Sequence, residues 1–184
     1  MPPLSITQIV CFFVVVIAAA CDLRTRKIPN VLTFPAAAAG ITLQFILSGP
    51  QGALAGIEGW FAAAGIMLAT RLLGWPFGMG DVKLVAAIGS FVGPSLILLV
   101  FFYFFISLAP VAWYRMFSAF PWRQIFSALP LLITTGNLSA LANLDWTRFN
   151  TARRSSLLFG PFYAVGTACA FLLERPTRIF LGFY

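Results

Sequence analysis

Two aspartates are the residues of this 184-residue chain whose types and positions could do chemistry. Asp81 lies in "PFGMGDVKL", directly behind Gly78 and Gly80, and Asp22 follows the apolar stretch "LSITQIVCFFVVVIAAAC". Two carboxylates that share a pocket can hold one proton between them and act as acid and base on a peptide bond. We therefore identify Asp22 and Asp81 as candidate catalytic residues, with the two glycines as the backbone of the motif.

Each aspartate also has a plainer interpretation. The pattern Gly-x-Gly-Asp is typical of a turn followed by an N-cap aspartate, which is common in any protein. Asp22 precedes "LRTRKIPN" and fits a solvated acid in a basic loop, where Pro29 stops the helix and Asn30 caps the next one. A catalytic role is favoured because both aspartates lie on the same face of the predicted membrane domain.

The elements that must position these carboxylates are membrane helices. Apolar residues make up 60% of the chain and charged residues 9%, which leaves too little polar surface to cover the core of a soluble protein. Apolar windows near or above the ~17 to 20 residues that cross a bilayer recur along the chain. We predict an all-α, polytopic membrane protein with a single domain over residues 1–184. Its transmembrane helices, about six, are predicted at residues 4–21, 31–47, 53–73, 82–92, 94–116 and 157–173.

The basic residues predict which side of the membrane the aspartates face. Ten of the twelve lysines and arginines fall on connections at one side of the predicted helices. By the positive-inside rule that side is the cytoplasm, and both chain termini lie outside. We expect these side chains to contact anionic lipids of the inner leaflet, and many of them need no further function to explain their positive charge. The ten are Arg24, Arg26, Lys27, Arg71, Lys83, Arg115, Arg123, Arg148, Arg153 and Arg154.

The long segment 117–156 is predicted as a cytoplasmic, interfacial connection. Its apolar part, "FSALPLLITTGNLSALANL", is interrupted by proline, glycine, asparagine and threonine. A membrane crossing there would also place three arginines outside, against the positive-inside rule. An interfacial helix with Trp122 and Trp146 near the headgroups fits better.

The helix that Asp81 opens is short for a membrane span. It runs about 11 residues before Gly93 and Pro94, or roughly 17 Å against a hydrocarbon core of ~30 Å. One of its ends therefore lies below the membrane surface, where irregular backbone is tolerated only if it lines protein or a water-filled cavity. We expect Asp81 to face such a cavity.

Three cations near the aspartates are further candidates. Lys83, Arg24 and Lys27 could bind substrate or tune the carboxylates, while snorkelling to the headgroups or setting topology explains them equally well. The chain has no histidine, and its three cysteines form no CxxC pair, which excludes the usual zinc site and a Cys/His catalytic pair. No metal, nucleotide or organic cofactor is implied. The net charge of +7 follows the membrane topology, so we expect no nucleic-acid partner.

At this point the sequence resembles a known family. The stretch "GMGDVKL", together with "DLRTRKIPN" after the first predicted helix, is similar to the type IV prepilin peptidases and preflagellin peptidases, the GxGD membrane aspartyl proteases. The resemblance covers residues 22–117, with weaker support from "FGPFYAVG" in the last predicted helix.

The resemblance implies an activity and a place in the cell. Asp22 and Asp81 would activate a water that attacks the peptide bond after a glycine, where the short basic leader of a prepilin meets its apolar N-terminal helix. Cleavage would occur at the cytoplasmic face of a bacterial or archaeal cytoplasmic membrane. The small size and the absence of a cysteine-rich insert make the chain most similar to the standalone enzymes of tight-adherence (Flp) pilus systems, so N-methyltransferase activity is not expected.

Two other classes of function stay open. In a small proton- or cation-coupled transporter the aspartates would relay ions, but acidic groups would then be spread through the membrane depth, and only Glu58 favours that reading. The third possibility is a non-catalytic subunit of a pilus secretion machine, in which the aspartates have lost their role.

Overall fold

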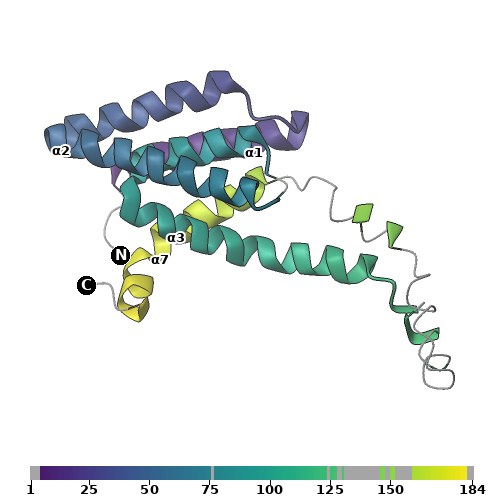
Figure 1. Ribbon diagram of the computed structural model, residues 1–184. Coiled ribbons are helices and arrows are strands. Elements are labelled where there is room, and N and C mark those ends of the chain that lie inside the picture. The colour runs from purple at the N-terminus through teal and green to yellow at the C-terminus, as the bar shows by residue number, and fades with distance from the viewer. Residues whose placement is uncertain are drawn as a thin grey trace. The chain divides into compact units, whose positions relative to one another are not determined.

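The computed structural model describes residues 5–75, 77–123, 125–127, 130, 146–147, 150–151 and 159–181, with side chains up to residue 174. Every regular element in these ranges is a helix, which confirms the all-α fold class. Figure 1 labels the helices in chain order along the colour gradient. They are α1 (Ile6–Thr25), α2 (Asn30–Leu72), α3 (Met79–Ala119) and α7 (Gly160–Leu181).

Helix α1 has a well-defined start and end. Ser5 is its N-cap, and the reciprocal hydrogen bonds between Ser5 and Gln8 form a capping box that satisfies two backbone N–H groups. At the other end Arg26 adopts the left-handed conformation, with φ 53°, and its backbone N–H donates to the carbonyl of Asp22 at 2.8 Å. Asp22 is thereby fixed in the last turn of α1.

Helices α2 and α3 are each interrupted once, at a glycine followed by a proline. Gly49 has φ 64° and Gly93 has φ 75°, a region of backbone conformation that glycine enters at little cost. The following proline fits the first turn of a new helical segment, because its missing N–H has no partner there anyway. Both interruptions lie in gaps between the predicted transmembrane helices, at residues 48–52 and at Gly93.

Three helices, α1, α2 and α3, are long and apolar enough to cross a membrane, as judged over the described residues. With one interruption each in α2 and α3, this arrangement is consistent with the predicted spans between residues 4 and 116. The total of six transmembrane helices stays a prediction.

The first part of α3 forms the centre of the helical core. Every residue from Leu84 to Phe91 is buried, as expected of a helix that is apolar on all sides and enclosed by other helices. The second segment of α2 packs closely against it, because a Cβ on Gly59 would collide with the carbonyl oxygen of Gly89, and a Cβ on Gly89 with that of Gly59. This close approach holds the helix that carries Asp81 in place.

The chain divides into two compact units. Residues 1–108 and 157–184 form the first, in which α1 packs against both α7 and α2. Residues 109–156 form the second, where the ring of Trp122 packs on Phe120 at 4.7 Å and on Phe117 at 5.0 Å. Most of the predicted interfacial segment lies outside the described residues, so its position at the headgroups stays a prediction, as does the single-domain organisation.

Candidate active site

The structure brings Asp22 and Asp81 together at one pocket of about 320 Å³ in the first unit. Asp22 reaches it from the last turn of α1 and Asp81 from the first turn of α3. Both side chains are only 8% exposed, so the protein shields two carboxylates that would ordinarily be solvated. The pocket is lined by Asp22, Arg26, Lys27, Ile28, Gly78, Gly80 and Asp81.

Asp81 is held by the turn that precedes it. The backbone N–H of Gly78 donates to Asp81 Oδ2 at 2.9 Å, and the Gly78 carbonyl accepts from the N–H of Asp81 at 3.1 Å. Since α3 begins at Met79, Asp81 is the third residue of the helix and reaches back over its start, unlike the N-cap aspartate of the plainer interpretation. The positive end of the helix dipole favours a carboxylate here.

Different steric contacts explain why positions 78 and 80 are both glycine. A Cβ on Gly78 would lie 3.2 Å from Asp81 Oδ2, tighter than an ordinary contact. A Cβ on Gly80 would lie 3.3 Å from the Cβ of Ile28, in the connection between α1 and α2. Glycine at both positions therefore allows the carboxylate and this connection to approach the backbone closely.

The backbone before the motif is tied to the end of α2. Arg71 donates from Nη1 to the carbonyl oxygen of Phe77 at 2.6 Å, and the Phe77 side chain is 2% exposed. A charged donor makes such a hydrogen bond stronger than one between neutral groups. From the sequence, Arg71 is predicted only to be one of the basic residues that set the topology, and its contact with this turn is not predicted.

Asp22 is held from a distant part of the chain. The backbone N–H of Gly160, the first residue of α7, donates to Asp22 Oδ2 at 2.9 Å across a separation of 138 residues. A Cβ on Gly160 would lie 2.8 Å from the Cβ of Asp22 and 3.0 Å from the Cα of Ala19, which leaves no room for a side chain. Gly160 was not predicted as a site residue; the only signal was its place in "FGPFYAVG".

The predicted cations occupy different positions. Lys27 lines the pocket, as does Arg26, whereas Arg24 is exposed and is not part of the lining. Lys83 donates from Nζ to Asn30 Oδ1 at 2.9 Å and lies 5.3 Å from the ring centroid of Phe34, so its contacts are with the start of α2. A role of Arg24, Lys27 or Lys83 in substrate binding or in tuning the carboxylates stays a prediction.

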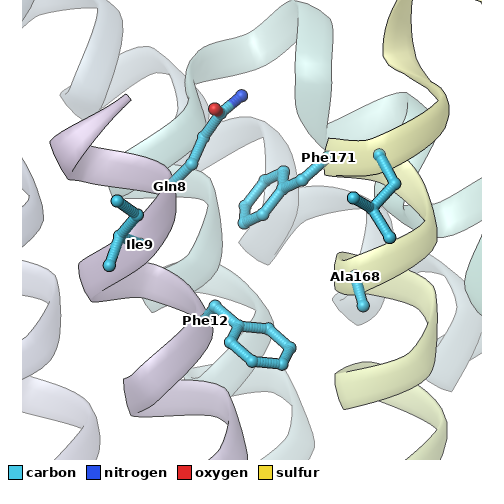
Figure 2. A pocket seen from close by; sticks show the side chains of 6 residues that line it. Gln8, Ile9, Phe12, Ala168 and Phe171 are labelled. Atoms are coloured by element: carbon cyan, nitrogen blue, oxygen red, sulfur yellow. The ribbon is translucent and has the colours of Figure 1, made fainter. Parts of the chain in front are cut away.

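A second cavity, of about 220 Å³, lies between α1 and α7 and offers no comparable chemistry. Figure 2 shows Phe12 of α1 and Phe171 of α7 in the space between the two helices. The wall of this cavity is apolar, and the amide of Gln8, a residue at its edge, donates to Glu174 Oε2 at 3.4 Å. The pocket with two carboxylates is therefore the better candidate for catalysis.

The hydrogen bonds leave one oxygen of each carboxylate for chemistry. Oδ2 of Asp22 and Oδ2 of Asp81 each accept a bond from a glycine N–H. Among the described residues, no hydrogen bond reaches either Oδ1. Two carboxyl groups that line one pocket, each with an oxygen left for a further partner, have the chemistry to act on a water molecule as acid and base.

Comparison with known proteins adds an independent line of evidence. Residues 9–113, more than half of the chain, match the type IV leader peptidase family. Over 173 residues the chain is 28% identical to the prepilin leader peptidase/N-methyltransferase of Dickeya chrysanthemi, an alignment that covers 90% of this chain and 50% of the relative. The chain thus spans about half the length of this curated relative. No solved structure gave a significant match.

Proposed function

Because the chain belongs to the type IV leader peptidase family, we propose that it is a membrane aspartyl endopeptidase that removes the short basic leader from prepilins. The observation that carries this proposal is the shared pocket of Asp22 and Asp81, in which each carboxylate has one oxygen bound by a backbone N–H. The pairing of two acids in a shielded site suits the hydrolysis of a peptide bond.

The two aspartates would work as one acid–base unit. The ionised carboxylate takes a proton from a water molecule, whose oxygen attacks the carbonyl carbon of the scissile bond. The protonated carboxyl group gives its proton to the carbonyl oxygen, which forms a neutral tetrahedral diol. When the diol collapses, the C–N bond breaks, one hydroxyl proton returns to the dyad and the other proton of the dyad goes to the leaving amine. Because the protons belong to the pair, no fixed role is given to either aspartate.

The surroundings of the pocket support an extended peptide as substrate. Gly78 and Gly80 present bare backbone to the pocket beside the carboxylates, and Ile28 supplies an apolar wall. Lys27 and Arg26 belong to the positively charged connections that the positive-inside rule assigns to the cytoplasm. Cleavage would thus take place at the cytoplasmic face of a bacterial or archaeal cytoplasmic membrane, next to anionic lipids.

The proposal is limited to the peptidase reaction. The relative from Dickeya chrysanthemi is also named for N-methyl transfer, but the chain corresponds to half of that protein, and we propose no methyl transfer here. We propose a peptidase similar to those of tight-adherence pilus systems, which needs no metal or organic cofactor. The transporter alternative receives no support from Glu58, which is exposed on α2 and is not part of the pocket lining.

The test is to incubate the purified protein, in vesicles with anionic lipid, with a purified prepilin that carries a short basic leader. We expect mass spectrometry to find the intact leader ending in glycine and a pilin with a new N-terminus, with or without EDTA. The same vesicles, loaded with a pH dye, test for proton movement. Proton movement without release of the leader would contradict the proposal and support the transporter class.

A further inference from the structure

Both carboxylates are bound by the same small unit of sequence, a phenylalanine followed by a glycine. Phe77–Gly78 lies before α3, and Phe159–Gly160 lies at the start of α7. In each pair the glycine N–H donates to Oδ2 of one aspartate, at 2.9 Å in both cases. The site therefore contains two equivalent backbone donors that come from distant segments of the chain.

The two phenylalanine rings are in contact with each other. The ring centroids of Phe77 and Phe159 are 4.8 Å apart, and the side chains are 2% and 5% exposed. Phe104 contacts both, at 6.2 Å and 6.4 Å, and the ring of Tyr163 stacks on Phe104 at 4.2 Å. Such a buried aromatic cluster is closely packed, so one ring cannot be displaced without moving its neighbours.

Each phenylalanine is joined to its glycine donor through one rigid peptide group. The carbonyl of each phenylalanine and the N–H of the following glycine belong to one planar peptide group. When repacking of the Phe77 and Phe159 rings displaces either phenylalanine Cα, it moves the N–H group of the following glycine, and with it the Oδ2 atom that this N–H binds. On the α3 side this peptide group is also held by Arg71, which donates to the Phe77 carbonyl.

We propose that Phe77 and Phe159 are positioning residues that set the separation of the Asp22 and Asp81 carboxylates through their contact with each other. The dyad is then assembled before substrate arrives, and α7 is part of the active site although it supplies no carboxylate. This inference rests on the proposed peptidase function. Its chemical basis is the steep dependence of catalysis on geometry, since a misplacement of about 1 Å can cost on the order of 100-fold in rate.

A double-mutant cycle tests the proposal. The prepilin assay is run with purified wild type, Phe77→Leu, Phe159→Leu and the double variant. KM is measured for each, and kcat is calculated from the concentration of folded protein. We expect each single variant to lose about tenfold in kcat with KM changed less than about twofold, because catalytic geometry is lost while the binding surface stays. The double variant is expected to fall no further than the more impaired single variant, since both changes break one contact.

Phe91→Leu is the matched control for loss of a buried ring. Phe91 lies in the same helix core, 1% exposed, and its backbone contacts α2 at Gln44. We expect this variant to lower the melting temperature about as much as the other leucine variants, with kcat per folded molecule within about twofold of wild type. If the double variant does not accumulate in the membrane, Phe77→Met and Phe159→Met, which lose the ring and keep most of its volume, replace the leucines in the cycle.

If wild type cleaves, three results would overturn the positioning proposal. The first is an unchanged kcat in both single variants, and the second is a double variant whose loss is the product of the two single losses. The third is a loss of kcat in Phe91→Leu as large as that in Phe77→Leu or Phe159→Leu. A wild-type protein that does not release the leader contradicts the proposed function itself. The two failures are therefore distinguishable in one set of measurements.

Discussion

Asp81 and Asp22 accept the same kind of hydrogen bond, but the two donors differ greatly in how the fold supplies them. The donor to Asp81 is Gly78, three residues earlier in the same turn. The donor to Asp22 is Gly160, 138 residues later, at the start of another helix. The Asp81 half of the site is thus built by local sequence, whereas the Asp22 half exists only when α7 packs against α1.

The largest difference between the halves is expected when each glycine donor is replaced by alanine. In Gly160→Ala the new Cβ meets the Cα of Ala19 and the Cβ of Asp22, which cannot move aside, so we expect kcat to fall by roughly 100-fold or more. In Gly78→Ala the nearest atom is Asp81 Oδ2 at 3.2 Å, and a small shift of the side chain should limit the loss to about tenfold.

Gly65→Ala is the control for this pair, because a Cβ at this exposed position on α2 meets nothing within 4 Å. Its cleavage rate should equal that of wild type, and its stability should rise by about 0.5–1 kcal/mol from helix propensity. Equal kcat losses in Gly160→Ala and Gly78→Ala would show that the two halves do not differ as proposed.

A smaller effect is expected at the link between α2 and the Asp81 turn. Arg71→Met removes the donor to the Phe77 carbonyl, and since this arginine is largely exposed we expect kcat to fall only about threefold. Arg71→Lys retains one charged donor, which is enough for a single carbonyl, and should recover most of the loss. An Arg71→Lys variant as impaired as Arg71→Met would mean that guanidinium geometry, and not the charge-assisted bond, positions the turn.

The local half of the site depends on short stretches of sequence, for physical reasons. The glycines before Asp81 and the Gly-Pro interruptions of α2 and α3 act through the backbone of their own neighbours, so their consequences can be read from short stretches. The charge distribution predicts that both acids lie at one membrane face, and this prediction uses the whole chain without any tertiary contact.

The distant half could not be predicted in the same way. Gly160 and Phe159 matter because of what packs against them, and the partners of a buried ring depend on tertiary structure. Arg71 is one of ten basic residues on the predicted cytoplasmic side, and nothing in the sequence indicates its contact with the Phe77 carbonyl. The resemblance of "FGPFYAVG" pointed to this segment but not to the bond from Gly160 to Asp22.

The most direct test of the account replaces each aspartate by asparagine in the purified protein. The amide side chain introduced at either position retains an oxygen for the glycine N–H but cannot exchange a proton, so the packing is kept while the chemistry is lost. We predict that Asp22→Asn and Asp81→Asn each slow release of the prepilin leader by roughly 100- to 10,000-fold. Glu58→Gln, at an exposed acid outside the pocket, should cleave at the wild-type rate. Wild-type cleavage by either asparagine variant would contradict the proposed Asp22/Asp81 dyad.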